Sequence, residues 1–280
     1  TTLELLEQVP AGMFQFEIGV QSTLPETLQQ ISRNVSLEQL AGNILYLKNK
    51  TNIHLHLDLI AGLPGEKYQQ FLKSIDWVVA LGADHLQIEP VKLLPGAPLR
   101  LQAESWGIKY DSSPPYTILK SKELTFFDLE RLRGIGRLLD LLVNSRRFEF
   151  LLPRLTVYFE QLSLFLEDLD SYWREKNLYH QRRSLRDLYL IIDNYLLSRF
   201  EGEKLAGLRE HLSRDFAHHE RVVGGSVPPF FAGNLSKDEL TAVRKRVKDE
   251  VEGMVRHGKV QYFAAPFEHL QDNPKRVVLI

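Results

Sequence analysis

Three stretches of the chain alternate hydrophobic and polar residues with a period of two, which is typical of a β-strand with one buried face. The first covers residues 13–22, the second residues 53–61 and the third residues 84–90. In each stretch the hydrophobic positions predict a face packed against helices, and the polar positions predict a face that is left for a ligand. The polar face of the second stretch carries His54, His56 and Asp58.

Helical spacing of hydrophobic residues separates these strands, over residues 26–34, 37–50 and 66–82. Strands that alternate with helices predict parallel pairing with right-handed crossovers. Central strands of an open doubly wound sheet are hydrophobic on both faces, whereas half-polar strands favour a barrel with a polar lumen. A closed barrel needs about eight such units. The sequence therefore predicts part of a barrel, and we expect the chain to be a piece of a longer protein.

The composition changes after the third predicted strand. Residues 93–122 are rich in proline, glycine and serine and predict a loop that covers a site. Most of the remaining chain has helical periodicity, so the sequence predicts an α/β domain over residues 1–122 and a mostly α-helical domain over residues 123–280. The helical patterns cover residues 125–145, 152–176, 184–200, 202–220 and 236–258, and short extended patterns cover residues 260–265 and 276–280.

Charge and composition exclude several classes of partner and chemistry. The formal net charge of -1 gives no electrostatic reason to expect a nucleic acid or an anionic membrane as a partner. The sequence has no uninterrupted apolar run of about 18 residues and no secretory leader, so we expect a cytoplasmic protein without a membrane span. The absence of cysteine excludes disulfides, thiolate zinc sites and cysteine-ligated iron–sulfur clusters within these residues.

Two alternative interpretations remain open at this point. His54, His56 and a later histidine, His85, are candidate ligands for zinc or another divalent ion in a metal-dependent hydrolase, because alternate positions on a strand lie on the same side. They are equally candidates for hydrogen-bonded polar residues of a barrel lumen. The helices after residue 124 are compatible with a non-catalytic interaction module, yet a packed helical core has the same periodicity.

Four short strings occur in order along the first hundred residues: FEIGVQS, TLQQISRN, HLDLIAGLPGE and LQIEPVKLLPGAPL. Together they resemble the second half of the radical S-adenosylmethionine (SAM) barrel, a TIM-like barrel of parallel strands. The likeness is to the branch of oxygen-independent coproporphyrinogen III oxidase and to cobalamin-binding-domain radical SAM proteins. It covers roughly residues 12–100. The long charged helical tail departs from the coproporphyrinogen oxidase pattern and leaves the substrate open.

The resemblance implies a role for five residues in cofactor binding. Gln21 matches the residue that approaches the methionine or ribose portion of SAM, and Arg33 matches the partner of the SAM carboxylate. Asp58 matches a carboxylate that contacts the ribose hydroxyls. Glu17 is a further candidate acceptor, and Ile60 is a candidate for packing against adenine. The resemblance assigns no catalytic residue and no metal ligand within this chain.

The resemblance also implies an activity. In this superfamily a reduced four-iron four-sulfur cluster cleaves SAM reductively and gives a 5′-deoxyadenosyl radical that abstracts hydrogen from the substrate. The cluster ligands lie in a CxxxCxxC loop, which we expect upstream of this chain, and cobalamin is a possible further cofactor of the full-length protein. We expect a small-molecule substrate and an electron donor as partners. The chain alone is then inactive, and its open strand edges make self-association an expectation.

Overall fold

A computed structural model describes residues 2–180, 183–220, 227–231, 235–251, 262–264, 267, 269 and 277–279. The chain divides into two compact units. Unit 1 comprises Thr1–Ser145 and Phe159–Ser171, and unit 2 comprises Arg146–Tyr158 and Tyr172–Ile280. Among the described residues, no helix is long and apolar enough to cross a membrane.

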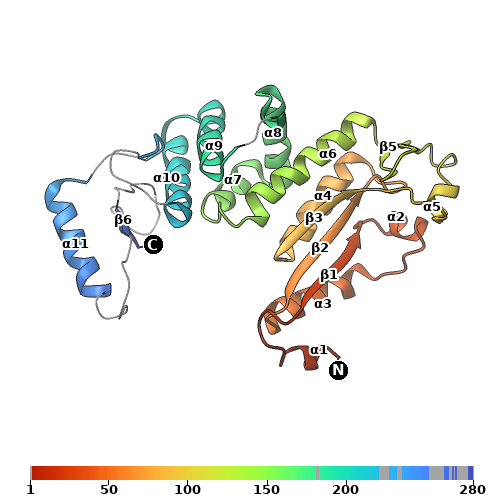
Figure 1. The fold of residues 1–280 in the computed structure, drawn as a ribbon, viewed down its shortest axis with the longest axis horizontal. Helices are drawn as coiled ribbons and strands as arrows, with labels where there is room; N and C mark the ends of the chain where they lie inside the picture. The colour runs from red at the N-terminus through yellow and green to blue at the C-terminus, as the bar shows by residue number, and fades with distance from the viewer. Residues whose placement is uncertain are drawn as a thin grey trace. The chain divides into compact units, whose positions relative to one another are not determined.

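Unit 1 is built on a parallel sheet with the strand order β1–β2–β3 (Figure 1). Each of the three strands predicted from the alternating pattern is present, and helices connect them, so the predicted parallel mixed α/β architecture is confirmed. A barrel is not seen in the described residues. The strands are β1 (Gln15–Gln21), β2 (His54–Ala61) and β3 (His85–Pro90), and the helices around them are α1 (Thr2–Leu6), α2 (Pro25–Gln30), α3 (Leu37–Lys50) and α4 (Tyr68–Ala80).

The alternating pattern of β2 gives the sheet one buried face and one accessible face. Leu55, Leu57 and Leu59 have no exposed surface. Helix α4 contacts β2 and buries its own hydrophobic stripe, which includes Phe71 and Ile75. Burial of each such side chain contributes about 1.5–3 kcal/mol relative to exposure, so this face holds unit 1 together. The opposite face is accessible and carries the polar residues of all three strands.

Helix α6 (Phe126–Leu139) lies along β3, as Figure 1 shows. Its approach is close because residue 136 is glycine: a Cβ at Gly136 would lie 3.4 Å from the Cβ of Ile88. The helix ends in a π-helical turn, η1 (Asp140–Asn144). The Asn144 side chain accepts a hydrogen bond from the Leu86 N–H at 3.0 Å and donates one to the Leu86 carbonyl at 2.9 Å. These bonds occupy the outer edge of β3, a usual protection against further strand pairing.

The predicted covering loop contains short regular elements, α5 (Pro98–Leu101), β4 (Lys109–Tyr110) and β5 (Ile118–Lys120). The Arg100 guanidinium lies over the rings of Tyr110 and Tyr116, at 5.1 and 4.8 Å from their centroids. It also donates a hydrogen bond to the Leu93 carbonyl at 2.9 Å. The contacts of the Arg100 guanidinium therefore hold the loop together, although the composition of the loop predicts only irregular structure.

Unit 2 is largely helical, as predicted, with one correction. The single helix predicted over residues 152–176 is wrong: it is interrupted at Glu160, whose φ of 65° lies in the left-handed region. The predicted helix over residues 236–258 is seen as far as residue 251, and the rest lies outside the described residues.

The helices of the second half of the chain are followed by a pair of antiparallel strands. The elements are α7 (Leu151–Phe159), α8 (Leu162–Glu175), η2 (Leu178–His180), α9 (Leu185–Arg199), α10 (Gly202–His219) and α11 (Lys237–Val251), with the antiparallel strands β6 (Tyr262–Ala264) and β7 (Val277–Leu279). Helix α8 is shared between the units.

The hydrophobic faces of α9 and α10 form a core within unit 2. Tyr189 and Tyr195 of α9 have no exposed surface, and the rings of Tyr189 and Phe216 meet edge to face with centroids 5.1 Å apart. The amphipathic periodicity that motivated the interaction-module alternative is therefore accounted for by packing within the unit.

The compact units divide after Ser145, whereas the sequence predicts a domain boundary near residue 122. The difference arises because α6 packs on β3 and so belongs with the sheet. A pattern of helical periodicity does not reveal which neighbour a helix will contact. Whether residues 1–122 and 123–280 fold separately stays a prediction.

Candidate functional site

The polar face of the sheet is organised in rows that cross the three strands. The strand register places Glu17 opposite His56, and His56 opposite His85. The next row toward the carboxyl ends of the strands places Asp58 between Gly19 and Gln87. Glu17 is exposed, whereas His56 and Asp58 are half-buried. The structure thus brings Glu17 and Asp58 to the same face on adjacent strands.

Gln21 reaches the site through an irregularity that the alternating pattern does not predict. The register of β1 shifts between Gly19 and Gln21, and Gln21 has a φ of 72°, in the left-handed region that non-glycine residues seldom adopt. A bulge of this kind turns a side chain away from the direction set by alternation. Here it gives Gln21 a place in the lining of a cavity at the carboxyl end of the sheet.

Arg33 contacts β1 at the glycine before this bulge. Its Nη2 donates a hydrogen bond to the Gly19 carbonyl. A Cβ at position 19 would overlap the Gln21 side-chain amide, so glycine allows Gln21 to approach here; the same Cβ would lie in ordinary contact with Arg33 Nη2, at 3.8 Å. The Nε of Arg33 is buried without a hydrogen-bond partner among the described residues. The guanidinium therefore holds donor capacity that the protein around it does not use.

The electrostatics of the polar face raise the pKa of Asp58. Burial raises the pKa of the Asp58 carboxyl above its usual range, and the nearby Glu17 raises it further, while His56 opposes the shift. A carboxyl in this position can accept or donate a hydrogen bond according to its protonation state. Both forms suit contact with hydroxyl groups.

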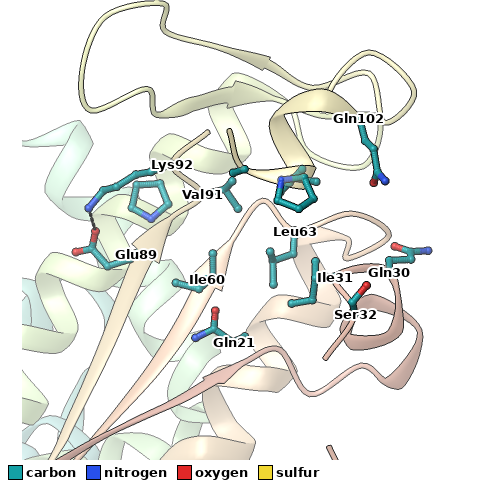
Figure 2. A pocket seen from close by; sticks show the side chains of 14 residues that line it. Gln21, Gln30, Ile31, Ser32, Ile60, Leu63, Glu89, Val91, Lys92 and Gln102 are labelled. Carbon is teal, nitrogen blue, oxygen red and sulfur yellow. Dashed lines mark hydrogen bonds and ion pairs between the residues drawn. The ribbon is translucent and has the colours of Figure 1, made fainter. Parts of the chain in front are cut away.

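A cavity of about 530 Å³ opens at the carboxyl end of the strands, the end where ligands of parallel α/β folds bind. Figure 2 shows Gln21, Ile60, Ile31 and Leu63 grouped together, with the Glu89–Lys92 ion pair on one side. The covering loop contributes Ala97, Pro98, Leu99 and Gln102 to its lining. Of the five predicted site residues, Gln21 and Ile60 line this cavity, whereas Glu17, Arg33 and Asp58 lie outside its lining.

The turn after β2 contains a buried carboxyl group that the sequence analysis did not identify. Gly62 and Gly65 adopt φ values of 99° and 81°, so the glycines of the GLPGE string are required by the backbone. The following residue, Glu66, has no exposed surface; its Oε1 accepts a hydrogen bond from the Ser74 hydroxyl at 3.0 Å, and its Oε2 is buried without a hydrogen-bond partner among the described residues. Burial raises the pKa of Glu66 to about 7. No periodic pattern marks this residue, since it follows a turn.

Replacement of Glu66 by glutamine is expected to reduce the pH dependence of stability. The folded pKa of about 7 lies above the ordinary 4.5, so between these values the folded state binds more protons than the unfolded state. Stability is therefore fully present below about pH 4.5 and declines as the pH rises toward 7, by up to about 3 kcal/mol from this group. Urea unfolding at pH 5 and pH 8 measures the decline, which Glu66→Gln reduces.

Glu104→Gln is the matched control, because Glu104 is an exposed glutamate of the same unit. It is expected to leave the pH dependence unchanged. Equal declines in the Glu66→Gln variant and the unsubstituted protein would contradict the assignment of this titration to Glu66.

The metal-dependent hydrolase alternative depends on how the histidines of the sheet are arranged. The rings of His56 and His85 stack with centroids 4.6 Å apart and planes inclined by 21°. His85 faces Asn144 and Asp140, with its Nε2 at 3.4 and 3.8 Å from them. In the part of the chain that the structure describes, no group of three histidine, aspartate or glutamate residues could hold a metal ion. The histidines are polar residues of the sheet face.

Comparisons with known proteins agree with the resemblance seen in the sequence. Over 76 residues the chain is 33% identical to the heme chaperone HemW of Mycobacterium tuberculosis, a match that covers 27% of this chain and 20% of HemW. Coproporphyrinogen III oxidase (HemN) from Escherichia coli, described as a radical SAM enzyme, also matches, with 16% identity over 44% of this chain and 33% of HemN. Its TM-score is 0.28, too low to carry a structural argument.

The chain thus resembles the heme chaperone HemW over one segment, and it spans about a fifth of this curated relative. A protein family is matched by the later part of the chain. A family model described as "Protein of unknown function (DUF4080)" matches residues 104–263, more than half of the chain. The protein therefore belongs to this family.

Proposed function

We propose that this chain is part of a radical SAM enzyme and that the accessible face of its sheet forms part of the SAM site. The observation that carries the proposal is the pair Arg33 and Gln21 at Gly19, beside a cavity at the carboxyl end of parallel strands. The helices after residue 122 are proposed to cover the substrate.

The residues present fit SAM in their chemistry. Arg33 would hold the methionine carboxylate, because a guanidinium offers paired donors and its buried Nε has no partner among the described residues. Gln21 would orient the methionine or ribose portion. Ile60, in the mostly apolar cavity, would pack on adenine, and Asp58 and Glu17 would accept from the ribose hydroxyls. When bound to a reduced four-iron four-sulfur cluster, SAM supplies the 5′-deoxyadenosyl radical of this superfamily.

The cluster itself does not fit these residues, because the 280-residue sequence has no cysteine. Its ligands are proposed to lie in another part of the full-length protein. A coproporphyrinogen oxidase-like reaction, a small-molecule substrate and an electron donor remain proposals that rest on the resemblance. Cobalamin and the cytoplasmic location stay expectations from the sequence.

The two edges of the sheet differ, and this difference supports the proposal that the sheet is part of a larger barrel. The outer edge of β3 is occupied by Asn144 and α6, whereas β1 pairs only with β2 among the described strands. Further strands are therefore proposed to add beside β1. In the isolated chain the same edge offers a route to self-association, which light scattering would detect.

The test is formation of 5′-deoxyadenosine, measured by mass spectrometry, by the full-length protein loaded with iron and sulfide under anaerobic, reducing conditions. The expected result is product that requires both the cluster and SAM. The isolated 280 residues are expected to form none, because they lack cluster ligands. A cluster-loaded protein that neither binds SAM nor forms product would contradict the proposal, and so would SAM cleavage by the isolated chain.

A further inference from the structure

A second kind of cavity lies within unit 2, between helices α7 and α10. It has a volume of about 300 Å³. Its lining carries two cations and two imidazoles against one carboxylate. These groups are Arg154, Lys204, His211, His269 and Glu203, and Tyr158 completes the polar wall.

Several residues of α10 that line this cavity lie on one face of the helix because they are spaced four residues apart. Glu203 and His211 are eight residues apart, a little over two turns, with Gly207 between them on the same face. Gly207 lies against His269, whose Cβ is 3.5 Å from the position that a Cβ at residue 207 would take, an ordinary van der Waals contact. The backbone N–H of His269 donates to Glu210 Oε2 at 2.8 Å, which fixes this wall of the cavity.

Lys204 is placed where a helix disfavours a cation. It lies in the first turn of α10, where the helix dipole is positive and unfavourable to lysine. No side chain caps this end of the helix, because the N-cap residue Glu201 makes no side-chain cap hydrogen bond. The Lys204 ammonium lies 5.8 Å from the Tyr158 ring centroid, on the cavity side of α7.

His211 is the second unfavourable feature. Its side chain is only 9% exposed, and its Nδ1 is buried without a hydrogen-bond partner among the described residues. Burial, together with the charges of Arg154 and Arg214, lowers the pKa of His211 to about 4. A neutral imidazole is thus held beside two guanidinium groups, and one of its nitrogens is left unpaired at a cost of about 1–3 kcal/mol.

We propose that this cavity is a binding site for a small ligand that carries a phosphoryl or carboxylate group. One bound anion would offset both unfavourable features: it would neutralise Lys204, accept from the first turn of α10 and bring an acceptor to the His211 imidazole. The site lies within the matched DUF4080 region except for His269. It goes beyond the proposed SAM chemistry and does not depend on it.

The test is an NMR titration of the protein with inorganic phosphate and, separately, with malonate, each compared with chloride at the same ionic strength. Either anion is expected to raise the pKa of His211 by about one unit or more, because a nearby opposite charge favours the imidazolium. The anion that acts at the lower concentration identifies the phosphoryl or the carboxylate source. Chloride is expected to leave the His211 pKa unchanged.

Variants make the test specific. Lys204→Gln changes an exposed side chain and is expected to fold normally, and it should weaken the response at least about tenfold. Arg154→Gln should act in the same direction. Lys237→Gln, which removes an exposed cation of the same unit, is the control and should bind as the unsubstituted protein does. Failure of both anions to shift the His211 pKa, or an undiminished shift in Lys204→Gln, would overturn the proposal.

Discussion

Replacement of Arg33 by alanine is expected to weaken SAM binding by about 100-fold or more. A guanidinium paired with a carboxylate makes charge-assisted hydrogen bonds worth about 1.5–3 kcal/mol each, and tenfold in affinity corresponds to about 1.4 kcal/mol. Arg33 is the basic residue whose guanidinium reaches β1 at Gly19, beside Gln21. Equilibrium dialysis with labelled SAM on the cluster-loaded full-length protein measures the loss, and 5′-deoxyadenosine formation should fall with it.

The Arg33 side chain also supports local structure, since it donates to the Gly19 carbonyl. A thermal melt of each variant therefore accompanies the binding measurement. Arg33→Lys keeps the charge but loses the paired geometry, and we expect it to recover only part of the affinity. Lys50→Ala, which removes an exposed cation at the end of α3, should bind SAM normally. A folded Arg33→Ala protein with unchanged affinity would remove Arg33 from the site and weaken the SAM proposal.

The strands and their polar face could be predicted because alternation is a local property of the sequence. His56, Asp58 and the buried Leu57 lie on the faces that their positions predict, and parallel pairing follows from the intervening helices. The same reasoning gave the helix start at Thr125, where the Thr125 side chain accepts from the Asp128 N–H. Each of these features depends on residues that are close in the chain.

The rest depends on contacts between distant residues. The bulge that redirects Gln21 has no pattern of its own, because a single register shift does not disturb the hydrophobic positions around it. Glu66 is buried beside α4, where the Ser74 hydroxyl donates to it, and no local pattern predicts this contact. The His85–Asn144 contact joins residues 59 positions apart. The roles assigned to Glu17, Gln21, Arg33, Asp58 and Ile60 stay predictions until SAM binding is measured.

Replacement of Asp215 by alanine is expected to lower the free energy of unfolding of unit 2 by about 3 kcal/mol. The side chain is 1% exposed, and its two oxygens accept from the backbone N–H groups of Phe150 and Leu151, each at 2.9 Å. Asp215 lies on α10 and so caps the first turn of α7 from another helix. Each lost bond to an ionised acceptor costs about 1.5–3 kcal/mol, and the two donors would be left unpaired.

The pH of the measurement decides how clearly this cap is seen. Burial raises the pKa of Asp215 to about 7, so the carboxylate is ionised at pH 8 and accepts both hydrogen bonds. Because this pKa lies above the ordinary 3.8, the stability that Asp215 contributes is greatest below about pH 4 and declines as the pH rises toward 7. Urea unfolding should therefore show a larger loss at pH 5 than at pH 8, and hydrogen exchange at pH 5 should show α7 amides about 100-fold less protected. Glu149→Ala, an exposed carboxylate beside Phe150, should change stability by no more than about 0.5 kcal/mol. If Asp215→Ala were no more harmful than this control, the capping bonds would not hold α7 in place, and Arg154 would lose the fixed helix on which the proposed anion site depends.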